Sequence, residues 1–302
     1  MERRFPYGGQ AVIEGVMIRG QSAVGTACRL LDGQIVVRTE SPDSLVQRHR
    51  WLRLPFVRGT PALIDAIRIG FRALIFSANV AVESEGQNPV SPLTFALTIA
   101  GALVVGIGLF VLLPSALIPR VTHDAFLLNL LEGLARLVIL VGYILIISRM
   151  QNVRRIFQYH GAEHQVIHAF ESGSEVNAEA ASRFSTSHSR CGTSFLLLVV
   201  VVGVLVHALV GWPAWHWRLL SRLLLFPVVA GVAYELIRLA GAHPESLLLR
   251  ALVAPGVWLQ RLTTRQPSPD QVEVALKALE AVLAEDSSAI ALAKAGRARA
   301  QS

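Results

Sequence analysis

The sequence predicts a mainly α-helical, polytopic membrane protein with four transmembrane helices, a small N-terminal β-hairpin region and a helical His-rich cytosolic insertion. Composition is the first reason: 53% of the 302 residues are hydrophobic and 16% are charged, whereas soluble domains carry about 25% charged residues. The mean hydropathy of +0.50 agrees. Four long apolar segments and one Asp-Gly turn between apolar runs are the other two reasons.

The first predicted region, 1–58, is a cytosolic β-containing region. Gly8-Gly9 and Gly20 bracket a strand-like run, and Asp32-Gly33 lies between two further apolar runs. An Asp-Gly pair accepts the positive φ angles of a two-residue hairpin turn, so it predicts a β-hairpin.

The next region, 59–92, has helical periodicity. Its apolar residues recur at helical spacing, and Arg68 and Arg72 lie on another face. Such a helix can lie in the membrane interface with arginines at headgroup level, or it can pack inside the cytosolic part. Both interpretations stay open. The apolar positions are Leu63, Ile64, Ile67, Phe71, Leu74 and Ile75.

Four apolar stretches predict two transmembrane hairpins, 93–147 and 194–240. The stretches cover about 93–113, 126–147, 194–211 and 219–240. A bilayer core of roughly 30 Å needs about 20 helical residues, which these stretches approach or exceed.

The positive charges predict the topology. They collect before the first span, after the second and after the fourth, at Arg48, Arg50, Arg53, Arg58, Arg68, Arg72, Arg149, Arg154, Arg155, Arg238, Arg250, Arg261 and Arg265. By the positive-inside rule, both termini and the central insertion are cytoplasmic, in a bacterial inner (plasma) membrane. We interpret the net charge of +7 as topology signals and contacts to membrane lipids, with no nucleic acid expected. No cleavable signal peptide or disulfide framework is expected.

The insertion, 148–193, carries the residues with metal chemistry. His160, His164 and His168 recur every four residues and share one face of a helix, and Glu163 and Glu171 can approach that face. His160 to His164 also reads His-x-x-Glu-His, in which two imidazoles bind zinc and the carboxylate serves as general base.

A second pair, His188 and Cys191, precedes the third span and can supply further nitrogen and sulfur ligands. The alternative is a solvated His/Glu face, with Glu163 and His164 paired to Arg154 or Arg155 at the membrane surface.

Four other ionisable residues stand out in apolar surroundings. Glu14 lies within an apolar strand and requires a partner, for which Arg19 or the metal region is available. His207, near the outer end of the third span, is expected to bond a backbone carbonyl. Glu132 and Arg136 are i,i+4 partners with a structural role.

The last region, 241–302, is predicted to be a cytosolic amphipathic helix followed by a disordered tail. The helix, 268–285, begins with the capping box Ser268-Pro-Asp-Gln271 and is expected to dock on the cytosolic part or on a partner.

The same motifs resemble those of the YqhQ-type bacterial membrane proteins: Tyr7-Gly-Gly-Gln-Ala-Val-Ile-Glu-Gly-Val-Met-Ile-Arg-Gly, Tyr159-His-Gly-Ala-Glu-His and Arg190-Cys-Gly-Thr-Ser-Phe. That family is described as uncharacterised or as predicted metal-dependent enzymes. The resemblance implies a site at His160, Glu163, His164, His168 and the His188–Cys191 pair. Ser189 stands where the family usually has proline, which is expected to loosen that turn.

The leading hypothesis is a zinc-type metalloenzyme, hydrolytic, at the cytosolic membrane face. A divalent metal, zinc by its donors, is held by His160, His164 and a third ligand from His188, Cys191 or His168, and Glu163 is the general base. The rival is a non-enzymatic scaffold or adaptor with a structural metal. A transporter is a weaker third reading. A homo-oligomer or a membrane protein partner is compatible with both the enzyme hypothesis and the scaffold hypothesis.

Overall fold

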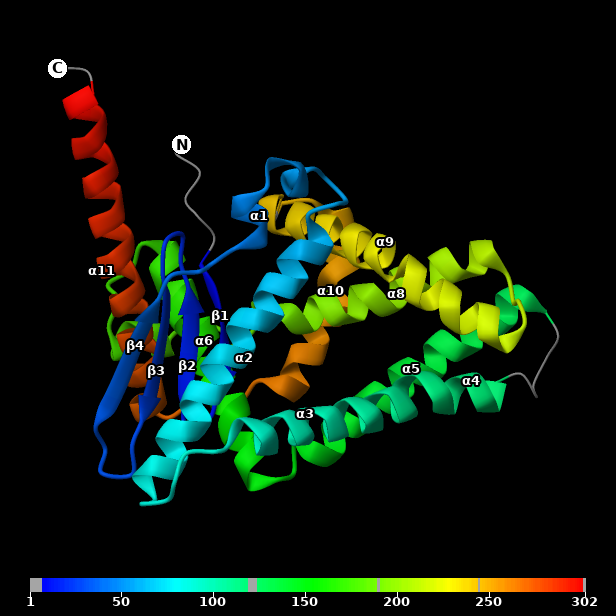
Figure 1. Cartoon of the computed structure of the whole chain (residues 1–302), viewed down its shortest axis with the longest axis horizontal. Helices are drawn as coiled ribbons and strands as arrows, with labels where there is room; N and C mark the ends of the chain where they lie inside the picture. Colours follow the sequence, from blue (N-terminus) through cyan, green and yellow to red (C-terminus); the bar gives the residue numbers. More distant parts are fainter. Residues whose placement is uncertain (1–6, 119–123, 189–190, 244, 301–302) are drawn as a thin grey trace.

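A four-stranded antiparallel sheet opens the chain in the computed structural model, which describes residues 7–118, 124–188, 191–243 and 245–300 (Figure 1). The strands pair in sequence order, β1-β2-β3-β4, as a meander. They are β1 (Gly8–Val12), β2 (Gly15–Arg19), β3 (Val24–Arg29) and β4 (Ile35–Glu40). The predicted hairpin is therefore part of a larger sheet.

The turn at Asp32-Gly33 joins β3 to β4 as predicted, but its length differs. The backbone N–H of Leu30 donates to the carbonyl of Gln34 over 2.8 Å, so three residues form the loop. Gly33 takes φ +89°, which glycine adopts without strain. The two-residue turn lies instead between β1 and β2, where Val12 pairs with Gly15.

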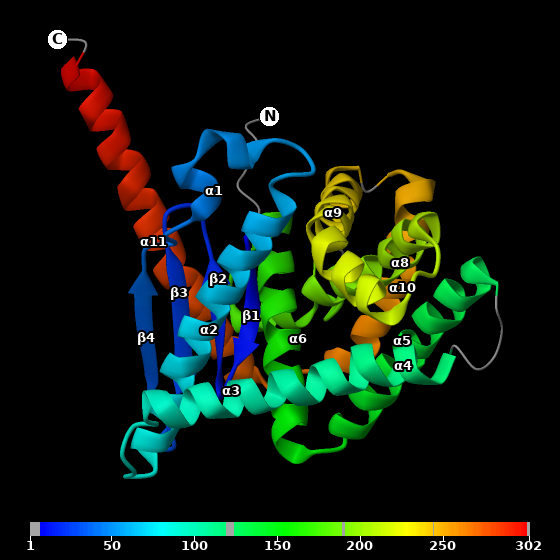
Figure 2. The same cartoon turned by 45° about the vertical axis from the view of Figure 1, so that its right-hand side comes forward.

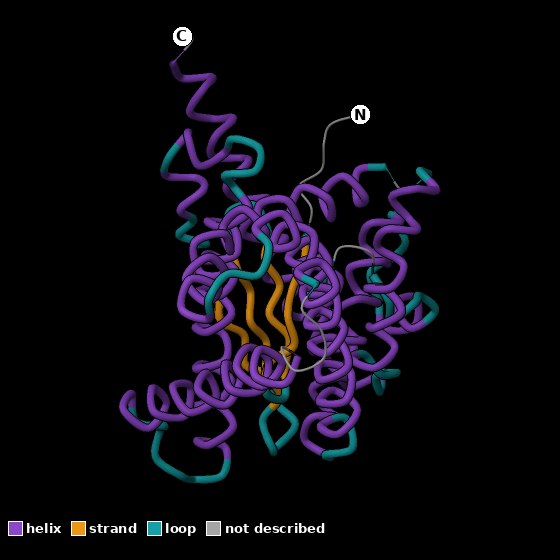
Figure 3. Tube along the Cα trace, turned by 90° about the vertical axis from the view of Figure 1, so that its right-hand side faces the viewer, coloured by secondary structure: helices purple, strands orange, loops and turns teal. Residues whose placement is uncertain are grey.

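Helices cover both faces of the sheet (Figure 2). On one face, α2 (Gly59–Ser84) packs against apolar residues of the strands. On the other face lie α6 (Gln151–Ser172) and α11 (Pro269–Ala300). Figure 3 shows the strands enclosed between these helices. The sheet-facing residues of this second core include Val16, Ile18 and Ala27.

The structure shows which face of α2 packs on the sheet, a point that the periodicity left open. The residues that it buries are mostly small or polar: Gly59, Pro61, Asp65, Ile69, Gly70, Ala73, Ser77 and Val80. In contrast, Ile64, Ile67, Phe71 and Ile75 of the predicted apolar stripe are 38–48% exposed. The helix thus packs on the sheet through its small residues, which allow close approach, and presents its large ones outward. The exposed stripe is compatible with a helix that lies in the membrane interface, and that interpretation stays a prediction.

Four helical segments are long and apolar enough to cross a membrane: Leu93–Leu117, Ala125–Ile147, Gly192–Val210 and Trp215–Ala242. They lie side by side to the right of the sheet in Figure 1. The first comprises α3 (Pro92–Ile107), a π-helical turn η2 (Gly108–Leu112) and α4 (Leu113–Leu117), and the others are α5 (Ala125–Ile147), α8 (Gly192–Val210) and α9 (Trp215–Ala242). These bounds differ from the predicted ones by at most four residues at either end.

Contacts join the sheet region to these segments. Arg58, at the start of α2, donates from Nε and Nη2 to Glu235 of α9 over 2.7 and 2.6 Å. A Cβ on Gly59 would lie 2.7 Å from the Cα of Gly231, so the two backbones touch. Short elements complete the connections: α1 (Leu45–Arg48), η1 (Arg50–Arg53) and α7 (Ala178–Ser182).

The C-terminal region contains one helix that was not predicted. This helix, α10 (Leu247–Thr263), packs on α8. One half of the capping box is confirmed, since the Ser268 N–H donates to Gln271 Oε1 over 2.9 Å, whereas the Gln271 N–H donates to the Ser268 carbonyl. Helix α11 then docks on the sheet. It continues to Ala300 rather than ending in the predicted disordered tail, and the alanine-rich sequence has high helix propensity.

Candidate metal centre

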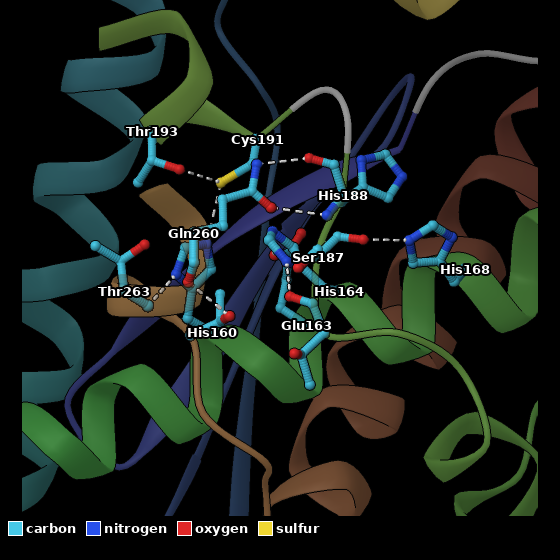
Figure 4. A network of polar contacts seen from close by, with 12 residues as sticks. His160, Glu163, His164, His168, Ser187, His188, Cys191, Thr193, Gln260 and Thr263 are labelled. Atoms are coloured by element: carbon cyan, nitrogen blue, oxygen red, sulfur yellow. Dashed lines mark hydrogen bonds and ion pairs between the residues drawn. The ribbon is translucent and has the colours of Figure 1, made fainter. Parts of the chain in front are cut away.

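The histidines of the insertion lie on α6, whose sequence explains both its length and its end. The helix runs from Gln151 to Ser172 and stops at Gly173, which adopts a left-handed φ of +73°. The four-residue spacing places His160, His164 and His168 along one side (Figure 4).

Three donor groups converge near the middle of this helix. His160 Nε2 lies 3.2 Å from the Sγ of Cys191, which arrives from the start of α8. The ligand atoms of His160, His164 and Cys191 all lie within 4.8 Å of one another. Zinc binds nitrogen at about 2.0 Å and sulfur at about 2.3 Å, so ligand atoms in a tetrahedral site lie about 3.3–3.7 Å apart. Small side-chain adjustments bring the three atoms to that spacing, and the donor set fits zinc.

Backbone carbonyls orient both imidazoles. His160 Nδ1 lies 2.9 Å from the Thr263 carbonyl oxygen, and His164 Nδ1 lies 2.6 Å from that of Thr186. A carbonyl oxygen only accepts hydrogen bonds, so Nδ1 carries the proton in each ring. The lone pair of the neutral imidazole then lies on Nε2, the nitrogen that faces the cluster. Metal-binding histidines are commonly held in this way.

Glu163 lies beside the same ligand atoms and is 4% exposed. Its Oε2 is 3.4 Å from Nε2 of His164. Its other side rests on β1, where a Cβ on Gly9 would lie 3.0 Å from Glu163 Cγ. Glycine at this strand position therefore leaves room for the carboxylate next to the three donors. Among the described contacts, Glu163 and His164 form no ion pair with Arg154 or Arg155. Arg155 instead pairs with Glu14.

The remaining predicted ligands face a different direction. His168 Nε2 lies 2.9 Å from the Ser187 carbonyl oxygen, and burial lowers the pKa of His168. His188 Nε2 lies 3.4 Å from Glu171 Oε2. The rings of His168 and His188 are 4.6 Å apart, which makes a second group next to the first. Of the three candidates for the third ligand, Cys191 is the one that joins His160 and His164.

One residue that the sequence interpretation missed fixes the segment between His188 and Cys191. Gln260 of α10 is fully buried. Its Oε1 accepts the His188 N–H over 2.8 Å, and its Nε2 donates to the His188 carbonyl over 2.8 Å and to Ser194 Oγ over 2.9 Å. A long polar side chain on the buried face of an otherwise mostly apolar helix was the available signal. The turn at Ser189 lies outside the described residues.

Two threonines complete the surroundings and were also not predicted. Thr263 contributes its carbonyl to His160, and Thr193 Oγ1 lies 3.3 Å from Cys191 Sγ. A backbone carbonyl carries no sequence signature, so only the fold reveals the first contact.

Glu14 has a partner other than those expected. It takes φ +49° in the turn after β1 and is not inside a strand. Arg155 Nε donates to Glu14 Oε1 over 2.6 Å, with a second bond from Nη2 to Oε2, and Tyr159 Oη lies 3.3 Å from Oε2. Burial, with the nearby Glu14 carboxylate, raises the pKa of Tyr159. The pair connects the sheet to α6, so neither Arg19 nor the donor triad provides the partner.

Comparisons with known proteins give a family but no activity. The model of a protein family of unknown function, DUF1385, matches residues 54–285. The uncharacterized protein YqhQ of Bacillus subtilis (strain 168) is 34% identical over 296 residues, which is 92% of each chain. No solved structure matches.

Proposed function

The chain belongs to the DUF1385 family, and we propose that it is a zinc-type, metal-dependent membrane enzyme that catalyses hydrolysis at the cytosolic face. One observation carries the proposal: the ligand atoms of His160, His164 and Cys191 lie within 4.8 Å of one another, and His160 Nε2 lies 3.2 Å from Cys191 Sγ. Two nitrogen donors and one sulfur donor are what zinc prefers, and three protein ligands leave one position for substrate or water.

A metal held by His160, His164 and Cys191 would supply Lewis acidity toward a water molecule or a substrate. Glu163 is then the proton acceptor, since its carboxylate lies 3.4 Å from the ligand nitrogen of His164. The carbonyls of Thr263 and Thr186 hold the two imidazoles, which prevents their rotation away from the centre.

The position along the chain supports a site at the membrane surface. Cys191 directly precedes α8, one of the helices long and apolar enough to span a bilayer. Arginines flank the spans on the side of the insertion, which is the cytoplasmic side under the positive-inside rule. We accordingly propose an inner-membrane protein with both termini cytoplasmic.

The first experiment is elemental analysis of detergent-purified protein, with the wild type beside the His160→Ala/His164→Ala variant. The proposal expects near-stoichiometric zinc in the wild type and its loss in the variant. Folded wild-type protein without metal above background, never exposed to chelator, would contradict it. The variant Glu163→Gln then separates the roles: it should keep the metal and lose hydrolysis of any substrate found by screening, whereas full activity excludes Glu163 as the base.

The burial of the site favours a second candidate function, a structural metal in a non-enzymatic scaffold. His164 and Glu163 are 3% and 4% exposed, and the donors and their supports come from α6, α8 and α10. A metal there would join three segments. This candidate expects chelation to lower the thermal unfolding midpoint strongly. A catalytic site expects the fold to survive chelation while activity is lost.

A further inference from the structure

A group of charged side chains lies between the apolar helices, far from the metal centre. Glu132 and Arg136 belong to α5, and Arg218 and Arg222 belong to α9. His207, close to the C-terminal end of α8, lies near these residues. Cys191 is sixteen residues earlier in the sequence, or about 24 Å away along that helix. The group therefore lies at the ends of the spans opposite the metal centre.

Glu132 is the centre of this group and is 2% exposed. Its Oε1 accepts hydrogen bonds from Ser115 Oγ over 2.6 Å, Arg136 Nη2 over 2.9 Å and Arg222 Nη1 over 2.5 Å. Its Oε2 accepts a further bond from Arg222 Nη2. Its carboxylate is thus occupied by two of the three arginines.

The positive charge exceeds what Glu132 can balance. Three arginines accompany one glutamate, which leaves two positive charges in excess among the described residues of the group. Among the residues that the structure describes, Arg218 contacts the Ser115 carbonyl at 3.4 Å and stacks over Trp212 at 4.2 Å. An uncompensated charge between apolar helices is costly, so an anionic partner would stabilise the arrangement.

Unused donors point to the same conclusion. The Nε atoms of Arg136, Arg218 and Arg222 are buried and have no acceptor among the described residues. Each guanidinium offers five N–H donors in a fixed fork, which matches the oxygens of a phosphate. Arg136 and Arg222 side chains are 24% and 11% exposed, so they turn inward to Glu132 and do not extend to the lipid surface.

We propose that this arginine group binds a phosphate, held between α4, α5 and α9. The phosphate belongs either to a lipid headgroup or to a free phosphate ion. Glu132 is the eighth residue of α5 and Arg222 the eighth of α9, about 10 Å from the helix ends. That depth lies just below the headgroup level, where a lipid phosphate can reach the arginines while its chains stay among the apolar helices. The site is independent of the metal centre.

The test uses the full-length protein in detergent micelles and its thermal unfolding midpoint. Three probes are compared: phosphatidylglycerol, diacylglycerol with the same acyl chains, and inorganic phosphate. The proposal expects stabilisation by phosphatidylglycerol but not by diacylglycerol, which lacks the phosphate. Equal stabilisation by inorganic phosphate alone identifies a free ion as the source. Failure of both phosphate-bearing probes overturns the proposal, and so does equal stabilisation by phosphatidylglycerol and diacylglycerol.

The variant Arg218→Gln removes one donor fork without breaking the Glu132 pairs. It should weaken the apparent affinity for the phosphate probe by about tenfold or more, as charge-assisted hydrogen bonds are lost. The matched control is Arg238→Gln, an exposed residue near the other end of α9. Identical affinity in Arg218→Gln and wild type would overturn the assignment. If Arg218→Gln does not fold, the lipid comparison on the wild type still decides the question, with native mass spectrometry to count bound phospholipids.

Discussion

Gln260 offers a direct test of whether the fold positions the metal centre. Its side chain makes three hydrogen bonds, two to the backbone of His188 and one to Ser194, and it is fully buried. The variant Gln260→Met keeps the length and shape of the side chain but removes all three bonds.

The expected cost follows from these contacts. The His188 N–H loses its described acceptor inside the protein, at about 2 kcal/mol, and the other two bonds contribute about 1 kcal/mol each. The His188 carbonyl retains a bond from the Cys191 N–H at 3.3 Å, which limits the loss there. The total is about 4 kcal/mol against folding. Because the segment that carries Cys191 is loosened, zinc affinity should also fall by about 10- to 100-fold, as for other residues that support metal ligands.

Zinc affinity is measured by competition with a chromophoric chelator, and stability by the thermal unfolding midpoint in the same detergent. The control is Gln266→Met, the same change at an exposed position after α10. A Gln260→Met protein with the zinc affinity and midpoint of wild type would refute the reasoning. A lower midpoint with unchanged affinity would show that Gln260 supports α10 but not the metal site.

The remaining predictions concern cysteine reactivity, helix packing and acid stability. Burial raises the pKa of Cys28 to about 12, so a maleimide at pH 8 should label Cys191 and leave Cys28 unmodified. Added zinc should protect Cys191 from the label. Mass spectrometry of peptides checks both results. Gly133→Ala should destabilise the protein by about 1–3 kcal/mol because its Cβ would lie 2.1 Å from a valine methyl of α8. The control Gly142→Ala should not, because a Cβ there meets open space. The thermal unfolding midpoints of the two variants decide. Burial acts to raise the pKa of Asp286, but hydrogen bonds from serine and tyrosine outweigh it and the net pKa is lowered. Its contribution is therefore present above the unfolded pKa and is lost as pH falls through the lower folded value, so Asp286→Asn should reduce the loss of stability in acid, measured as midpoint against pH.

Sequence periodicity predicted the elements better than their faces. The four apolar helices and the histidine spacing on α6 follow from composition and local pattern, and both agree with the structure. On α2 the helical period is confirmed, but the period alone did not decide which face packs on the sheet. The sheet accepts Gly70, Ala73 and Ser77 because small residues let a helix approach strands closely, whereas periodicity weighs only the size of apolar side chains.

The choice of the third ligand could not be made from the sequence. His188 and Cys191 are three residues apart, so both were within reach of His160 and His164. What separates them is a set of contacts made by distant residues: Gln260 holds the His188 backbone, and the Thr263 carbonyl turns His160 toward Cys191. Contacts over such sequence separations depend on how α8 and α10 pack, which no local pattern encodes.

The origin of the donors and their supports has a consequence for biogenesis. His160 and His164 are synthesised early, Cys191 follows about thirty residues later, and the Thr263 carbonyl and Gln260 come only after α9. Proteins are made from the N-terminus, and their parts fold as they emerge. A nascent chain that has inserted its first helical hairpin therefore has the imidazoles but neither the sulfur nor the groups that orient them. The geometry of the centre is complete only once the ribosome has passed the last of the apolar helices, so under the proposed function a metal would be bound only after that point.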